Sequence, residues 1–249
     1  GSINSLSFNG VNDFFYLSPS PALQTDYKSI SLWIKPSKNP INAFQYLVGH
    51  TVDFSFSKSC GFYINGGQIG FTYSSGNNAA FEDEVFATNN NCEQSYLDNQ
   101  WHFVVGTYDG NYLKIYVDGE LKGVNVVPGG ANVIYYGSGT GGSGGGAIPF
   151  LVGAMKDLSS AYKGLMSDVA IFDYALTSNE ISNYYCSGLT GNESGLRSFW
   201  KMDEGNGTTL NDNGPNNVDL FIGINGWAGN ANSASWDVES KPNCTFYDY

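Results

Sequence analysis

The sequence predicts an all-β fold built from antiparallel strands, and three observations support this prediction. The chain has 249 residues, of which 15% are aromatic and only 14% are charged, and it contains 32 glycines. Aromatic strands joined by tight turns have this composition, whereas helical bundles and coiled coils do not. Short alternating segments are separated by Asn-Gly and Asp-Gly pairs, and no internal repeat of about 20 to 50 residues is present.

The N-terminal half contains four predicted strands. In each of them apolar residues alternate with others, and a turn residue or Pro36 ends the pattern. Asn65-Gly66 between the last two is the strongest short-range hairpin signal. The four predicted strands are Ser5–Phe8, Ser29–Lys35, Cys60–Ile64 and Gln68–Tyr73.

The centre of the chain predicts an antiparallel meander. Its three strands are Trp101–Tyr108, Tyr112–Val117 and Glu120–Val127. The Asp-Gly pairs at Asp109 and Asp118 separate them, and such pairs favour two-residue hairpin turns.

Two more strands and one helix follow the meander. We expect strands at Ile148–Val152 and Gly164–Phe172, and the glycine-rich stretch from Gly137 to Gly146 predicts a flexible surface loop. Thr177 to Glu180 is a capping box, so a helix of about two turns should begin there. Its expected apolar stripe is Ile181, Tyr184 and Tyr185.

Three blocks of the sequence resemble laminin G-like modules of the concanavalin A-like lectin/glucanase superfamily. They are Leu6–Gly10 with Asp13 after it, the segment from Trp101-His102 through Asp109-Gly110 to Asp118-Gly119, and Gly164–Ile181. In this order and spacing they cover most of residues 5–185. The resemblance implies a concanavalin A-like jelly-roll sandwich of two antiparallel sheets, one of them concave, with one short helix.

A fourth block, Phe199–Thr209, is similar to a family segment that in many members comes first, whereas here it comes last. Either residues 196–225 supply strands to the same sandwich, making 1–249 one domain, or the block opens a second module. We favour one domain, because half a module would expose apolar strands such as Phe199-Trp200 and Leu220-Phe221.

The charge of the chain bounds its partners. It carries 11 basic and 23 acidic residues, which gives a net charge of −12. Such a surface repels phosphate backbones and anionic lipids, so we expect no nucleic-acid partner. No apolar run approaches the roughly 18 residues that a membrane helix needs, so we expect no membrane insertion. Neutral glycans, basic protein patches and divalent cations remain compatible with it. The sequence leaves the oligomeric state open.

Four cysteines, without any Cys-x-x-Cys pair, favour disulfides over a zinc site. We expect Cys60–Cys92, which would pin the long loop after the first hairpin, and Cys186–Cys244, which would tether the C-terminal tail. The crossed pairings and four free thiols are the alternatives. Paired disulfides indicate an oxidising, secreted or cell-surface setting.

The expected function is non-catalytic. A retaining glycosidase needs two carboxylates about 5 Å apart. The nearest acidic run is Glu82–Glu84, where neighbours on a strand would point to opposite faces, and its context favours a solvated loop. Neither His50 nor His102 lies in a catalytic motif. The sequence therefore favours an extracellular adhesin, fibre-tip or lectin-like domain that mediates cell adhesion by binding glycan or a surface protein. A hydrolase or lyase of the same fold, and a ligand-free spacer, are the alternatives.

Two long loops supply the candidate ligand-binding residues, because sugars stack on aromatic rings and bond to planar amides. Segments of this length without regular structure are often functional. The candidates in Ser74–Gln100 and Pro128–Ala147 are Phe81, Asn89, Asn91, Tyr96, Tyr135 and Tyr136.

The resemblance also implies one calcium ion near the junction of the first and last strands. The matching positions are Asp168, Asn211 and Asp212. Calcium takes roughly six to eight hard oxygen ligands. An ordinary polar turn is the alternative.

Overall fold

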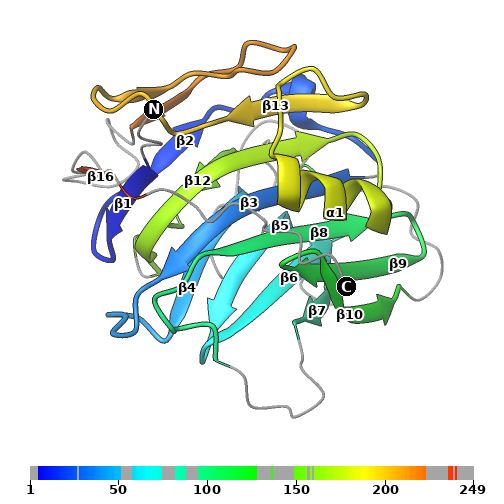
Figure 1. Cartoon of the computed structure of the whole chain (residues 1–249), viewed down its shortest axis with the longest axis horizontal. Coiled ribbons are helices and arrows are strands. Elements are labelled where there is room, and N and C mark those ends of the chain that lie inside the picture. Colours follow the sequence, from blue (N-terminus) through cyan, green and yellow to red (C-terminus); the bar gives the residue numbers. More distant parts are fainter. Residues whose placement is uncertain are drawn as a thin grey trace, which may run out of the picture.

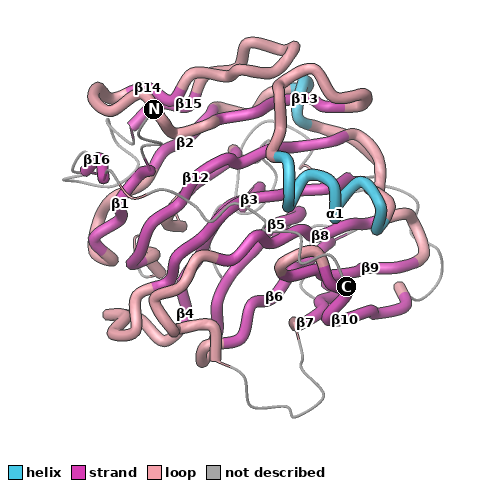
Figure 2. The backbone as a smooth tube through the Cα atoms, viewed as in Figure 1, coloured by secondary structure: helices cyan, strands magenta, loops and turns pink. Residues whose placement is uncertain are grey.

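The computed structural model is a sandwich of two antiparallel sheets with one α-helix (Figure 1). It describes residues 5–26, 28–51, 58–74, 82–87, 95–127, 136, 149–155, 158, 160–222, 235–237 and 239. Figure 2 shows that helix α1 (Ser178–Ser187) lies across the outer face of one sheet. The expected class, an all-β sandwich with one short helix, is confirmed.

The first sheet has the strand order β10-β9-β8-β3-β12-β1-β16, and β13 pairs with β12 beside the end that β1 leaves open. Its strands are β1 (Ser5–Asn9), β3 (Lys28–Pro36), β8 (His102–Tyr108), β9 (Tyr112–Val117), β10 (Glu120–Val126), β12 (Lys163–Phe172), β13 (Leu196–Trp200) and β16 (Ser235–Asp237). The meander predicted from two Asp-Gly turns is confirmed as β8, β9 and β10.

The second sheet has the order β14-β15-β2-β11-β4-β5-β6-β7. Its strands are β14 (Thr209–Leu210), β15 (Leu220–Ile222), β2 (Phe15–Leu17), β11 (Phe150–Val152), β4 (Phe44–Thr51), β5 (Lys58–Asn65), β6 (Gln68–Ser74) and β7 (Glu82–Phe86). A short 3₁₀ helix, Pro21–Leu23, precedes β3. The hairpin predicted at Asn65-Gly66 is confirmed as β5 and β6.

The core lies between the two sheets and is aromatic and aliphatic throughout. Leu32 and Val104 of the first sheet and Phe62 and Phe71 of the second are fully buried there. Phe62 and Phe71 lie with ring centroids 4.8 Å apart. Strand alternation places these residues on the inner faces, so the outer faces are left to carry other chemistry.

The residues after Gly195 contribute strands to both sheets. β13 pairs with β12 in the first sheet, and β15 pairs with β2 in the second. Trp200, at the end of β13, is fully buried, and its ring stacks on Phe150 at 5.3 Å. Apolar surface that an isolated half-module would expose is therefore covered by the sandwich.

Short polar side chains lock the turns of the motif-bearing segments. Asn9 donates its backbone N–H to Asp13 Oδ2 (2.7 Å), and Asn9 Oδ1 accepts from the backbone N–H of Val11 (2.7 Å). Asp109 Oδ1 accepts from the backbone N–H of Tyr112 (2.8 Å). These are the local side-chain bonds that favour Asn and Asp in turns.

The capping box at the start of α1 is confirmed in both directions. Thr177 Oγ1 accepts from the backbone N–H of Glu180 (3.3 Å), and Glu180 Oε2 accepts from the backbone N–H of Thr177 (2.8 Å). The helix is 10 residues long, somewhat more than the expected two turns. Its apolar stripe packs on the first sheet, where Tyr185 stacks on Trp33 with a centroid distance of 5.7 Å.

The prediction that the acidic run Glu82–Glu84 forms a solvated loop is wrong. Glu82–Glu84 begins β7, the edge strand of the second sheet. Asp83 pairs opposite Tyr73, and Glu84 pairs opposite Thr72. The run of charges hides the strand, because an edge strand tolerates charged side chains that a central strand would not.

Candidate binding site

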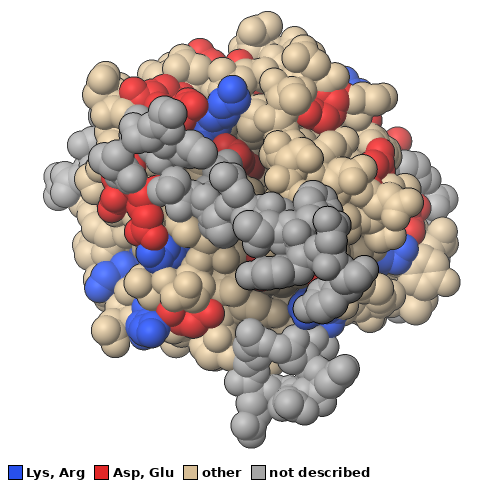
Figure 3. Space-filling view, viewed as in Figure 1, with Lys and Arg blue, Asp and Glu red and all other residues tan. Residues whose placement is uncertain are grey.

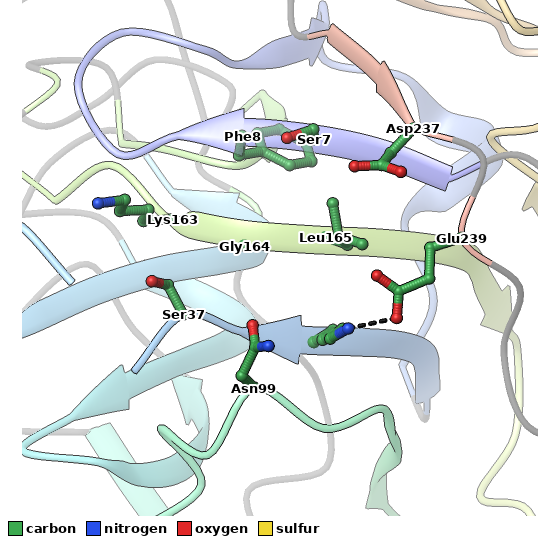
Figure 4. Close-up of a pocket in the computed structure, with 10 residues that line it drawn as sticks. Ser7, Phe8, Ser37, Asn99, Lys163, Gly164, Leu165, Asp237 and Glu239 are labelled. Carbon is green, nitrogen blue, oxygen red and sulfur yellow. Dashed lines mark hydrogen bonds and ion pairs between the residues drawn. The ribbon is translucent and has the colours of Figure 1, made fainter. Parts of the chain in front are cut away.

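A polar hollow of about 280 Å³ lies on the outer face of the first sheet (Figure 4). Strands β1, β3, β12 and β16 form it together with the loop that precedes β8. Its lining consists of Ser7, Phe8, Lys35, Ser37, Asn99, Lys163, Gly164, Leu165, Asp237 and Glu239. Seven of these ten residues carry hydroxyl, amide or charged groups within a single depression.

Strand register explains the floor of the hollow. Ser7 of β1 pairs opposite Leu165 of β12, and Leu165 pairs opposite Lys35 of β3. Leu6 and Ile34 point into the core, so their neighbours Ser7 and Lys35 point outward. Leu165 retains 9% of its surface. The floor therefore places a small apolar surface between a hydroxyl and an ammonium group.

Two loop residues form the rim beside β3. Asn99 adopts a left-handed backbone conformation (φ 60°) and donates its N–H to the carbonyl oxygen of Pro36 (3.1 Å). Ser37 donates its N–H to the carbonyl oxygen of Lys163 (3.0 Å). The asparagine is exposed, and Figure 4 shows its side chain on the same side of the hollow as Ser37.

Charges of both signs meet in the hollow. Lys35 forms an ion pair with Glu239, and Lys163 Nζ donates to the carbonyl oxygen of Asn39 (3.2 Å). Asp237 is exposed, opposite Ser5 of β1. Figure 3 shows acidic and basic groups interspersed over the visible face of the protein rather than gathered by sign. The hollow thus contains two basic and two acidic side chains, whose charges balance.

His102, at the start of β8, contacts the loop of residues 95–101 that carries Asn99, which we call the rim loop. Its Nδ1 lies 2.8 Å from Asp118 Oδ2, and its Nε2 lies 3.2 Å from Asp98 Oδ2. The ring is only 7% exposed and meets the edge of Tyr96 at 5.2 Å. Burial lowers the pKa of His102, but the hydrogen bonds and negative charges of Asp118 and Asp98 outweigh burial and raise it.

Of the six sequence-predicted ligand residues, the structure describes Tyr96 and Tyr136. Tyr96 and Tyr136 are 2% and 9% exposed, and the Tyr136 hydroxyl is bonded to the backbone of Thr25. This corrects the expectation for these two rings, because they pack in the core and offer no face to a sugar. Phe81, Asn89, Asn91 and Tyr135 lie outside the described residues.

The hollow residues were not found by sequence reasoning. Ser7 and Lys35 occupy outward positions of two predicted strands, so alternation places them on an exposed face but not beside each other. Lys163 precedes a predicted strand, and Asp237 lies in a tail without clear periodicity. Their convergence depends on strand pairs that are remote in sequence, and no local pattern reports such pairs.

The residues named for calcium are engaged in local hydrogen bonds as they are arranged. Asp212 Oδ1 accepts from the backbone N–H of Phe199 and Gly214 (both 2.8 Å), and its Oδ2 accepts from Val218 (2.9 Å). Among the described residues, no group of three or more His, Cys, Asp and Glu is placed to hold a metal.

Asn211 donates both its backbone N–H and its side-chain amide to Glu204 Oε1 (2.7 and 3.3 Å). Asp168 Oδ1 accepts from Ser167 Oγ (3.3 Å). Each of the three residues thus serves a local polar contact, and calcium stays a prediction.

Two of the four cysteines are described. Cys60 is buried, Cys186 is partly exposed, and the two are not bridged to each other. Their expected partners, Cys92 and Cys244, lie outside the described residues. Both disulfides therefore stay predictions. Peptide mapping without reductant tests them.

The groups that a catalytic reading would use are placed in the interior or at an edge. His50 and His102 are the only histidines of the chain, and they are 1% and 7% exposed. The Tyr63 hydroxyl donates to Glu84, so that carboxylate of β7 already has a partner.

Within the described part of the chain, the structure contains no helix with the length and apolarity that a membrane span requires.

Two solved structures resemble the fold. The first is a "putative carbohydrate binding protein" from Bacteroides ovatus, with 15% identity and a TM-score of 0.66 over 97% of this chain and 61% of that chain. The second is a heptameric SAP-like pentraxin from Limulus polyphemus, with 18% identity and a TM-score of 0.52 over 90% of this chain and 95% of that one. At these identities the likeness shows the fold alone.

The sequence itself gives the family. Comparison with curated proteins finds no match. A family model described as the concanavalin A-like lectin/glucanases superfamily matches residues 9–182. That span contains the turn-locking Asp13 and Asp109 and the capping box of α1. The chain therefore belongs to the laminin G-like branch of the concanavalin A-like lectin/glucanases superfamily.

Proposed function

We propose that the chain is a non-catalytic recognition module that binds a glycan in the hollow between β1, β3, β12 and β16. The observation that carries this proposal is the convergence of hydroxyl, amide, ammonium and carboxylate groups around Leu165 on one exposed sheet face. The chain would act in a secreted or cell-surface protein, as an adhesin or lectin-like domain.

The chemistry of the lining suits a sugar. Asn99 supplies a planar amide at the β3 side and Asp237 a planar carboxylate at the β16 side, so they can bond to hydroxyls at opposite ends of a bound sugar. Ser7 of β1 and Lys163 of β12 add an acceptor and a donor, and Leu165 offers an apolar contact for the C–H face of a ring. A volume of about 280 Å³ suits one end of a glycan.

The comparisons support binding at a coarse level. The Bacteroides ovatus structure carries carbohydrate binding in its description, and the pentraxin shares the sandwich. This chain spans about three fifths of the length of the first of these, so any activity of the whole Bacteroides protein is a separate matter. Fold likeness alone does not assign a ligand.

A polysaccharide hydrolase or lyase is the second candidate, because the superfamily includes glucanases. Such an enzyme would need a carboxylate pair about 5 Å apart or an exposed general base. Both histidines are buried, and Tyr63 occupies the Glu84 carboxylate. A ligand-free spacer is the third candidate, and it would have no use for a polar hollow.

A glycan array combined with an assay for released reducing or unsaturated sugar tests the proposal. We expect specific binding without release. Asn99→Ala should lower the array signal about tenfold, because one charged or amide contact is worth about 1.4 kcal/mol. Asn179→Ala, at an exposed position of α1, is the matched control and should bind as the wild type does.

Three results would overturn the proposal. Sugar release at a useful rate would make the chain an enzyme. Glycan binding that is unchanged in both Asn99→Ala and Lys163→Ala would place the ligand elsewhere. Binding to immobilised protein without binding to any glycan of the array would favour a protein partner.

A further inference from the structure

We propose that His102 is a positioning residue, whose protonated imidazole ties the rim loop to the sheet and releases it when the pH rises. The proposal rests on the proposed function only in that the loop forms one rim of the hollow. The order of the rim loop therefore depends on pH. The loop is held firmly in mildly acidic surroundings and less firmly in alkaline ones.

The geometry that carries the proposal is a carboxylate on each side of one ring. Asp118 Oδ2 lies 2.8 Å from Nδ1, and both oxygens of Asp98 lie 3.2–3.3 Å from Nε2. An imidazolium donates from both nitrogens, whereas a neutral imidazole has one donor and one lone pair. Only the charged form therefore bonds to both carboxylates at once.

The two carboxylates are held differently, which decides where the neutral ring would let go. Asp118 is fixed by a second bond, from the backbone N–H of Phe103 to its Oδ1 (2.9 Å), and it lies in the tight turn between β9 and β10. Asp98 has the longer contact and belongs to the loop. A neutral His102 keeps its proton toward Asp118, so its lone pair faces the charge of Asp98.

The loop transmits this change to the hollow. Asp98 Oδ1 also accepts from the backbone N–H of Gln100 (2.9 Å), so the carboxylate closes a turn around Asn99. Asn99 is the residue with φ 60° that donates its N–H to Pro36. Loss of the ring contact loosens the turn that fixes this asparagine at the rim.

Within the described residues, the other groups that face the ring do not supply the switch. Tyr96 of the loop lies against the ring edge, and burial together with Asp118, Asp98 and Glu120 raises its pKa to about 12, so it stays neutral. Glu120, after the β9–β10 turn, pairs with Lys122. From the neighbouring strand β3 the register partner is the apolar Ile34.

The direction of the effect follows from the contacts. Asp118 and Asp98 together raise the pKa of His102 above the ordinary 6.5 despite burial of the ring. At a pH below this raised pKa the ring is protonated and the loop is held. The contact to Asp98 is lost as the pH rises through the raised value.

Nuclear magnetic resonance of the free protein tests the proposal without any ligand. Between about pH 5.5 and about pH 8.5 we expect the Asn99 amide to shift with the same midpoint as the His102 ring. Exchange protection of that amide, corrected for the intrinsic pH dependence, should fall about fivefold across the transition.

Two variants separate positioning from plain structural support. Asp98→Asn keeps an acceptor for Gln100 but removes the charge, so the Asn99 profile should become flat while the protein still melts cooperatively. Asp109→Asn is the matched control: it weakens another turn-locking carboxylate, bonded to Asn111 and Tyr112, and should leave the Asn99 profile unchanged.

The proposal is overturned if the Asn99 amide ignores the His102 titration, if the His102 midpoint lies below 6.5, or if Asp98→Asn retains the wild-type profile. These outcomes differ from failure of the proposed function. A glycan array without hits would remove the ligand while leaving the coupling of His102 to Asn99 measurable.

Discussion

The outer face of the first sheet has two ends with opposite chemistry. At one end Trp33, Phe103 and Phe172 form an apolar cluster under α1, and the helix buries it. At the other end Lys35 and Leu165 lie in a polar hollow that no helix of the described residues covers. On β3 the change takes two residues, from Trp33 to Lys35.

This difference separates what makes the fold from what equips it for binding. The family-like motifs supply turn locks and the capped helix, and two of their residues, Ser7 and Leu165, also line the hollow. The hollow draws on Lys35, Asn99, Lys163 and Asp237, of which only the backbone positions are dictated by the fold. We therefore expect the helix-covered end to govern stability and the hollow end to govern recognition.

Removing residues 195–249 should have the largest effect, because the C-terminal segment serves both ends. It provides β13 and the buried Trp200, and it also provides β16 with Asp237 at the hollow. We expect insoluble or molten protein, seen as loss of the near-ultraviolet circular dichroism and of a cooperative melt. A truncated chain that folds cooperatively with wild-type stability would contradict the single-domain account.

Phe172→Ala tests the helix-covered end. The ring is fully buried and stacks on Tyr184 at 5.8 Å. Its removal should lower the free energy of unfolding by about 3–5 kcal/mol in a urea titration. Phe221→Ala, at a phenylalanine that is 48% exposed, should cost about 1 kcal/mol or less and is the control. Comparable losses for both variants would contradict the assignment of the cluster as structural.

The first two predictions depend on strands and packing that the sequence alone predicts only in part. The Asp-Gly turns fix β8, β9 and β10 because such turns act locally. Strand β4 was missed because Leu47 and Val48 are both buried around a bulge, which breaks the alternation. Strand β16 was missed because its three residues pair with β1, more than 200 residues away, and the local sequence shows no clear periodicity.

The candidate site was less accessible to sequence reasoning than the fold. Long loops and surplus aromatics pointed to Tyr96 and Tyr136, but both rings fill the core, as aromatic side chains commonly do. Polar residues at outward strand positions carry no local signal of their neighbours. Only the register of β1, β12 and β3 brings Ser7, Leu165 and Lys35 into one row.

A change of pH should have a moderate effect on stability through His102. Its pKa in the folded state is raised above 6.5 by Asp118 and Asp98, against the lowering effect of burial. The stabilisation it provides is therefore complete below about pH 6.5 and is lost as the pH rises through the folded-state value. His102→Gln should abolish that part of the pH dependence of urea unfolding. Stability that rises over the same interval in the wild type only would contradict this sign.

Lys163→Ala should have a small effect on stability and a large one on recognition. Its ammonium donates to Asn39 at the surface, so the free energy of unfolding should change by about 0.5 kcal/mol or less. Affinity for the best oligosaccharide of the array should fall about tenfold. Lys38→Ala, at an exposed lysine nearby, is the control and should change neither quantity.

Calcium should have the smallest effect. The Asp212 carboxylate already accepts three backbone N–H groups, and Asn211 donates to Glu204. Equal melting temperatures with calcium and with a chelator would remove the calcium prediction. A rise in Tm with calcium that the chelator reverses, and that Asp168→Asn abolishes, would establish the metal site that the family resemblance implies.

Chemical-shift mapping with the best oligosaccharide of the array tests the central claim most directly. The account predicts that the largest amide shifts gather at Ser7, Asn99, Lys163 and Asp237, with the helix-covered end unchanged. Shifts gathered instead on the outer face of the second sheet, around Tyr16 and Phe221, would contradict it. That result would leave the fold intact and move the recognition surface to the other side of the sandwich.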